Sequence, residues 1–240
     1  MQSIFFFVAL FMLAVSELAQ TPQPRSDSQT KTANTQPPNG WITTGANPQD
    51  YEIYLDSTVY RSGKASGTLK SKPSSTNEMF AAMAQAIKPD NYRGKRIRLS
   101  GYLKTADVAY YSGFWLRIDG AEPYKMLGFD NMGNRPVKGT SDWKKYEVVL
   151  DVPNDAGLIV FGANLAGIGQ VWADDMKIEV VGNDVASTNR PPSPEDEAAM
   201  QKQDEEMRRK NPEEYERDRK SYNEKKMTRP LQPVNLDFEK

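Results

Sequence analysis

The chain has 240 residues and a formal net charge of −1, and it contains neither histidine nor cysteine. A charge this close to zero creates no field that attracts nucleic acid, so we expect no nucleic-acid partner. The lack of histidine removes the commonest general base and metal ligand. The lack of cysteine excludes disulfides, thiol nucleophiles and cysteine-based zinc sites. The composition therefore favours a protein that is not an enzyme.

The N-terminus resembles an export signal. Residues Ile4–Val15 are all apolar, a run too short to span a bilayer comfortably but suited to the apolar part of a signal peptide. We predict a signal peptide over residues 1–19, a periplasmic or secreted protein, and no stable membrane insertion after cleavage. No lysine or arginine precedes the run, so a buried strand and a retained anchor remain alternatives. Residues 20–40, rich in Thr, Ser, Gln, Asn and Pro, are predicted to form a disordered spacer.

Short segments with alternating apolar and polar residues begin at Trp41. In Lys95–Lys104, the apolar residues Ile97, Leu99 and Leu103 alternate with polar ones, as in a strand with one buried face. Similar patterns predict further strands at Tyr51–Leu55, Ala65–Lys70, Gly113–Asp119, Tyr146–Val152, Gly157–Leu165 and Gln170–Val181. Because no helical pattern separates these strands, they predict an all-β sandwich over residues 41–183.

Glu78–Ile87 is ambiguous within this block. Its alanines and the spacing of Met79, Met83 and Ile87 fit a helix, but the segment is also short and apolar enough for a strand. The residues alone leave both structures open.

The composition changes again after the predicted sandwich. We expect residues 184–229 to form a Pro-rich hinge followed by a helix that is dense in charges of both signs and exposed to solvent. Asn211-Pro212 should break or kink this helix, because proline cannot donate a backbone hydrogen bond. A thin stripe of Met200, Met207, Tyr215 and Tyr222 could instead lie on a surface or a partner.

The last residues alternate again. Val234, Leu236 and Phe238 are apolar, with polar residues between them, so residues 230–240 are predicted to form a strand.

Several spaced segments resemble a bacterial jelly-roll domain, similar to carbohydrate-binding modules and galactose-binding-like domains. These segments are Tyr92–Asp107, Phe129–Tyr146, Val148–Pro153 and Gly167–Val181. Domains of this type also occur attached to AraC-type regulators and to secreted peptidases. The resemblance implies a jelly-roll β-sandwich over about residues 41–181, with Glu78–Ile87 as a strand.

The resemblance also implies a role for the C-terminus. Similar modules commonly open with an Asn-Leu-Asp-Phe-Glu strand before a Gly-Trp pair, whereas here Asn235–Glu239 closes the chain and Gly40-Trp41 opens the domain. We therefore expect the C-terminal strand to return across the charged helix and complete the sandwich, where it would cap an exposed edge. The alternative is the start of a second module.

A structural Ca²⁺ ion is the only cofactor that the resemblance suggests. Related jelly rolls often hold this ion between the glutamate of the opening strand and an aspartate of the final strand. The matching residues here are Glu239 and Asp174 or Asp175. Calcium needs six to eight oxygen ligands, and a capping hydrogen bond or a lysine pair would explain the same carboxylates.

A binding surface is predicted on the polar face of the two clearest strands. If their apolar residues face the core, Arg98, Tyr102, Trp115 and Arg117 face outward, and a loop with Asp130 and Asn131 could lie at the rim. An aromatic ring flanked by planar polar groups suits a sugar, so a glycan is the expected ligand. Alternatively, Trp115 is covered by the C-terminal helix or a loop and belongs to a second small core.

The favoured function is an exported, non-catalytic module that binds carbohydrate or cell-envelope glycan. A structural or protein-interaction module, with a protein partner, is the alternative that the mixed-charge helix suggests. A sensory domain related to transcriptional regulators is a further alternative, although no helix-turn-helix is evident in the sequence.

Overall fold

The structure, a computed structural model, describes residues 36–122, 125–190 and 208–240, together with residues 195, 198, 202, 205 and 206. The predicted signal peptide, most of the predicted spacer and part of the predicted hinge lie outside the described residues. None of the helices in the described part of the chain is long and apolar enough to cross a membrane.

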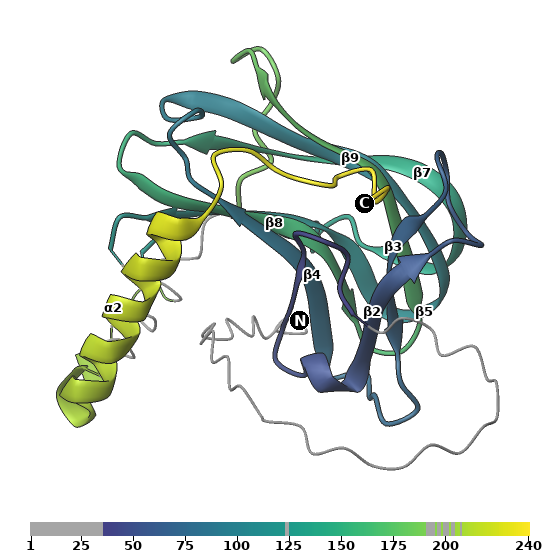
Figure 1. Cartoon of the computed structure of the whole chain (residues 1–240), viewed down its shortest axis with the longest axis horizontal. Coiled ribbons are helices and arrows are strands. Elements are labelled where there is room, and N and C mark those ends of the chain that lie inside the picture. The colour runs from purple at the N-terminus through teal and green to yellow at the C-terminus, as the bar shows by residue number, and fades with distance from the viewer. Residues whose placement is uncertain are drawn as a thin grey trace.

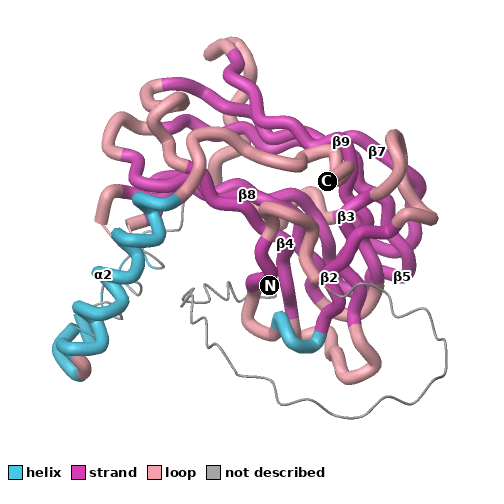
Figure 2. Tube along the Cα trace, viewed as in Figure 1, coloured by secondary structure: helices cyan, strands magenta, loops and turns pink. Residues whose placement is uncertain are grey.

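Nine strands form the sandwich (Figures 1 and 2). In chain order they are β1 (Ile42–Thr44), β2 (Tyr51–Asp56), β3 (Ser66–Ser71), β4 (Phe80–Ile87), β5 (Lys95–Gly120), β6 (Met126–Asp130), β7 (Val137–Val152), β8 (Ala156–Ala166) and β9 (Gln170–Val181). A short 3-10 helix (Pro48–Asp50) precedes β2. The predicted all-β fold is confirmed, and the ambiguous Glu78–Ile87 segment contains strand β4.

Strand β5 belongs to both layers of the sandwich. Its first part, residues 95–106, pairs with β7 and β9, and its last part, residues 111–120, pairs with β6 and β8. The register shifts between these parts, and Asp107 has a φ of 51°, so the strand bends as it passes from one layer to the other. One layer therefore has the order β2-β3-β9-β5-β7, and the other has the order β1-β4-β8-β5-β6.

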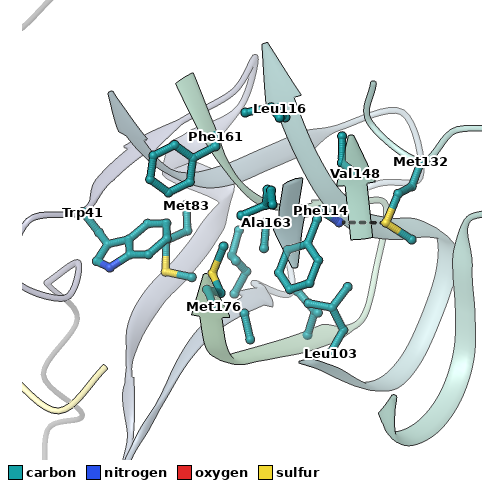
Figure 3. Packing of buried hydrophobic residues seen from close by; sticks show 14 of the residues in the cluster. Trp41, Met83, Leu103, Phe114, Leu116, Met132, Val148, Phe161, Ala163 and Met176 are labelled. Atoms are coloured by element: carbon teal, nitrogen blue, oxygen red, sulfur yellow. Dashed lines mark hydrogen bonds between the residues drawn. The ribbon is translucent and has the colours of Figure 1, made fainter. Parts of the chain in front are cut away.

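The main core lies between these two layers. Phe114, Phe161 and Leu103 are fully buried there, and Met132 packs beside Phe114 with its sulfur 3.3 Å from the Phe114 backbone nitrogen (Figure 3). Ile97, Leu99 and Leu103 from one part of β5 share this core with Phe114, Leu116 and Ile118 from the other. The inward alternation predicted for both segments is therefore confirmed.

Helix α2 (Pro212–Thr228) extends from one end of the sandwich (Figure 1). The described residues among 195–210 are also helical, and Asn211 interrupts the helix before Pro212. Pro212 occupies the first turn of α2, where its missing N–H costs no hydrogen bond. The predicted break at Asn211-Pro212 is confirmed.

The C-terminal segment returns from α2 to the sandwich, as predicted. Phe238 is fully buried in the main core and stacks on Trp41, with ring centroids 5.1 Å apart. The Met176 backbone nitrogen donates a hydrogen bond to the Leu236 carbonyl over 3.0 Å. The segment does not form the predicted strand, because Asn235 and Phe238 adopt left-handed φ angles of 48° and 59°. It follows a sequence of turns that places Phe238 in the core.

Candidate ligand-binding groove

The four outward residues predicted to form one binding surface lie on two different layers. Arg98 and Tyr102 belong to the part of β5 that pairs with β7 and β9, whereas Trp115 and Arg117 belong to the part that pairs with β6 and β8. Because β5 crosses between the layers, outward residues of its two parts face opposite sides of the sandwich. The predicted platform of four residues therefore does not form.

Arg98 and Tyr102 are engaged by neighbouring charged residues. Arg98 forms an ion pair with Glu179 at 2.7 Å and lies 3.6 Å from a carboxylate oxygen of Glu147. The Arg61 guanidinium lies 3.5 Å from the centre of the Tyr102 ring. Both side chains therefore have interaction partners within the chain and do not need a ligand to explain their positions.

Trp115 belongs to a second, smaller core on the outer face of the other layer. Only 6% of Trp115 is exposed. It clusters with small or branched residues of β4 and β8, which are Ala82, Ala84, Ala86, Leu158 and Val160. Three partly buried residues, Ile42, Phe129 and Tyr222, pack against this cluster. Trp115 therefore belongs to a second small core that Tyr222 of the C-terminal helix helps to cover, which was the alternative to an exposed binding surface. The Trp115 indole nitrogen makes no hydrogen bond to any of the described residues.

Arg117 and Asp119 lie at the edge of this second core, where α2 attaches. Arg117 Nε lies 2.9 Å from Asp119 Oδ1, and burial raises the pKa of Asp119 above its ordinary value. Tyr222 packs beside them with its hydroxyl 3.5 Å from the Gly120 carbonyl, and Lys226 donates to the Ala121 carbonyl over 3.0 Å. Burial, together with the charge of Asp119, raises the pKa of Tyr222.

Asp130 and Asn131 shape their own loop. The Asp130 carboxylate is fully buried, pairs with Arg135 at 2.7 Å and accepts a hydrogen bond from the Met132 backbone nitrogen. Asn131 donates to the Tyr111 hydroxyl and accepts from the Gly133 backbone. These bonds hold Met132 in a left-handed conformation with its side chain in the core.

The three carboxylates predicted to hold calcium instead hold the loop between β2 and β3. Asp174 accepts hydrogen bonds from the backbone nitrogens of Arg61, Ser62 and Asp175, and burial raises its pKa. Asp175 pairs with the Arg61 side chain and accepts from the Ser62 hydroxyl. Glu239 accepts from the Lys64 and Ala65 backbone nitrogens.

This set of hydrogen bonds does not fit a cation site. The oxygens of Asp174 face N–H donors, whose positive ends would repel a metal ion. In the part of the chain that the structure describes, no three acidic residues are arranged to hold a metal. The residues therefore fit a clamp of hydrogen bonds, the alternative raised from the sequence.

A groove lies on the same outer face as Trp115, beside the C-terminal segment. It encloses about 290 Å³ between Ile42 of β1, Ala84 and Ala86 of β4, and Arg229 and Pro230 after α2, with Gly40, Trp41, Gln85 and Val234 completing its lining. The Gln85 side chain bonds both the nitrogen and the carbonyl oxygen of Val234, which fixes the C-terminal wall.

The sequence contains one signal for this groove, a row of small apolar residues on the outer face of β4. Ala82, Ala84 and Ala86 alternate along β4 and face outward, where a strand more often carries polar residues. Two of them, Ala84 and Ala86, line the groove, and their small side chains leave it room. The same segment also fits a helix in the sequence, because it is rich in alanine and because Met79, Met83 and Ile87 are four residues apart.

No family model matches the chain. A curated relative from Bacillus subtilis (strain 168), described as the uncharacterized HTH-type transcriptional regulator YbfP, is 45% identical over 150 residues. The match covers 62% of this chain and 50% of the relative, so the chain spans about half the length of that protein.

Among solved structures, the chain is similar to a C-terminal family 22 carbohydrate-binding module of Clostridium thermocellum Xyn10B. The two are 13% identical with a TM-score of 0.44, and the match covers 62% of this chain and 89% of the module. A family 16 carbohydrate-binding module is 16% identical with a TM-score of 0.41, over 59% of this chain and 91% of that one. The chain is thus similar to both kinds of protein that its sequence motifs resemble, carbohydrate-binding modules and a transcriptional regulator.

Proposed function

We propose that the chain is a non-catalytic module that binds a glycan in the groove beside α2. The observation that carries this proposal is the groove itself, which has an apolar floor of Ile42, Ala84 and Ala86 and a polar edge at Arg229. Sugars present apolar C–H faces and polar hydroxyls, and this combination of floor and edge suits both. Its volume of about 290 Å³ lies near the lower end of small-molecule sites, which run from roughly 300 to 1,000 Å³. One or two rings of a longer glycan would fit.

The residues that line the groove support binding without catalysis. Hydrolysis of a glycosidic bond commonly needs two carboxylates on either side of the bond. None of the lining residues is an aspartate or a glutamate. The proposal is therefore a module that holds a glycan and leaves it intact.

Titration of the whole chain with glycans tests this proposal. Similar solved structures are described as xylan-binding and as a complex with β-1,4-galactotriose, so xylohexaose and this galactotriose are the first probes. Ala86→Phe should fill the groove and reduce binding at least tenfold, whereas Val180→Phe, which adds the same ring at an exposed site of β9, should leave it unchanged. Thermal unfolding of both variants checks that each is folded. Equal binding by the two variants would exclude the groove, and a glycan that is cleaved would exclude a non-catalytic role.

Export is part of the same proposal. It rests on the apolar run Ile4–Val15, which suits a signal peptide. Expression in a bacterial host, followed by fractionation and mass spectrometry of the N-terminus, would show a cleaved protein outside the cytoplasm. An intact N-terminus in the cytoplasmic fraction would contradict export.

A ligand-sensing module related to transcriptional regulators is the second candidate. It is favoured by the 45% identity to a Bacillus subtilis protein described as a helix-turn-helix regulator. Such a module would bind its ligand inside the cytoplasm, so the location of the native protein separates the two candidates.

A further inference from the structure

One charged residue, Arg229, lines the groove. Its side chain is half-buried against Pro230 and the floor of the groove, and burial lowers its pKa. Within the described part of the chain, no carboxylate oxygen lies within ion-pair distance of this guanidinium. The groove therefore contains a partly desolvated positive charge without a counter-ion from those residues.

Five arginines of the sandwich are placed differently, because each pairs with a carboxylate of the same chain: Arg61 with Asp175, Arg96 with Asp151, Arg98 with Glu179, Arg117 with Asp119 and Arg135 with Asp130. The side chain of Arg93 has acceptors as well, because it donates to the backbone carbonyls of Asn154 and Ala156. Removing an arginine from water without such a partner costs free energy, which an anionic ligand would offset. The contrast points to a ligand as the partner of Arg229.

Two further features lie beside Arg229. The backbone nitrogen of Lys88 donates to the Pro230 carbonyl over 2.9 Å, so the backbone of a second cationic residue lies next to the residue that follows Arg229. Arg229 is also the C-cap of α2, where the helix dipole favours a positive charge. Arg229 therefore stays ionised although burial lowers its pKa.

We propose that the groove selects glycans that carry a carboxylate, such as those containing a uronic acid, and that Arg229 binds this carboxylate. A guanidinium presents two parallel N–H groups that match the two oxygens of a carboxylate. The sugar ring would lie over Ala84 and Ala86, which form the floor beside Arg229. This inference rests on the proposed glycan-binding function and specifies its ligand class.

A matched pair of ligands tests the proposal. Isothermal titration of the whole chain compares a xylo-oligosaccharide with the same oligosaccharide bearing a glucuronic acid branch. The acidic ligand should bind roughly tenfold more tightly, as expected for one charge-assisted bidentate contact. This preference should decrease as salt is raised, because salt screens the ion pair.

Two variants assign the preference to one residue. Arg229→Gln keeps a long polar side chain without the charge, so the tenfold preference for the acidic ligand should disappear and the two ligands should bind with equal affinity. Arg219→Gln removes an exposed arginine of α2, which pairs with Glu216, and should keep the full preference. Preserved preference in Arg229→Gln would overturn the role of Arg229.

The outcomes separate this inference from the proposed function. Equal binding of both ligands to the unmodified chain would overturn the selectivity but keep the glycan-binding function. Failure of both ligands to bind would overturn the two together.

Discussion

Asp56 holds the start of the loop between β2 and β3. Its Oδ1 atom accepts hydrogen bonds from the Thr58 backbone, the Thr58 hydroxyl and the Val59 backbone, and its Oδ2 atom accepts one from the Trp172 indole. Burial raises the pKa of Asp56, but these bonds favour the charged form more strongly and the net result is a lowered pKa. The residue therefore stabilises the fold only when it is ionised.

The pH dependence of stability follows from this shift. Because the folded pKa lies below the unfolded value of about 3.9, the contribution of Asp56 is present above pH 4 and is lost as pH falls through the folded pKa. Asp56→Asn should cost about 1–2 kcal/mol at pH 7, because hydrogen bonds to a neutral amide are weaker than those to a charged carboxylate. Urea unfolding at a series of pH values should show this difference closing below pH 4.

Glu52→Gln, on the same strand, is the control for this measurement. It removes a carboxylate to which the structure assigns no hydrogen bond or ion pair, so it should leave the unfolding free energy nearly unchanged. A difference between Asp56→Asn and the unmodified chain that stays constant down to low pH would contradict the assigned role.

At the scale of elements, α2 is attached to the sandwich near its C-terminal end. Tyr222 packs on the second core and Lys226 bonds the Ala121 carbonyl, whereas Arg219 and Lys220 are exposed. Tyr222→Ala should reduce the unfolding free energy by about 1–3 kcal/mol, because a large partly buried side chain is lost. It should also shift tryptophan fluorescence to longer wavelength as Trp115 becomes exposed.

Lys220→Ala provides the matched control on the same helix. It shortens an exposed side chain and should change neither stability nor fluorescence. If Tyr222→Ala behaves like Lys220→Ala, α2 does not cover Trp115 in solution.

The C-terminal segment stabilises the sandwich through Phe238. This ring is fully buried and stacks on Trp41, so Phe238→Ala should cost about 3–5 kcal/mol in chemical unfolding. Leu231→Ala changes a residue of the same segment that is 48% exposed, and it should cost far less. Similar losses in the two variants would show that the segment does not pack as described.

These elements also show which features the sequence can predict. Alternation of apolar residues located the strands, because one buried face imposes a period of two on each strand. It could not reveal that Lys95–Lys104 and Gly113–Asp119 belong to one bent strand in two layers, since alternation is the same in either sheet. The pattern therefore predicts one surface for Arg98, Tyr102, Trp115 and Arg117, whereas the structure places them on two.

The C-terminus and the groove illustrate the same limit. Alternation of Val234, Leu236 and Phe238 predicted a strand, but Phe238 reaches the core from a left-handed turn. Arg229 and Ala86 are far apart in sequence, and only the return of the chain after α2 brings them to one groove. No local pattern could have predicted that contact.

For the whole molecule, the carboxylate clamp predicts stability that does not depend on calcium. Asp174 and Glu239 connect β9 and the C-terminal segment to the loop after β2 through backbone hydrogen bonds. Millimolar Ca²⁺ or EDTA should therefore leave the unfolding temperature unchanged. A rise of several degrees with Ca²⁺, absent in Asp174→Asn, would show that these carboxylates hold the ion after all.

For the whole molecule, the central proposal is ligand binding on the outer face of β1 and β4, beside Arg229. Nuclear magnetic resonance shift mapping tests this placement most directly, with glucuronic-acid-branched xylo-oligosaccharide added to the labelled chain. We predict that the largest amide shifts fall at Ile42, Ala84, Ala86 and Arg229. Shifts concentrated on the opposite layer, around Arg98, Tyr102 and Glu179, or no shifts at all, would contradict the account.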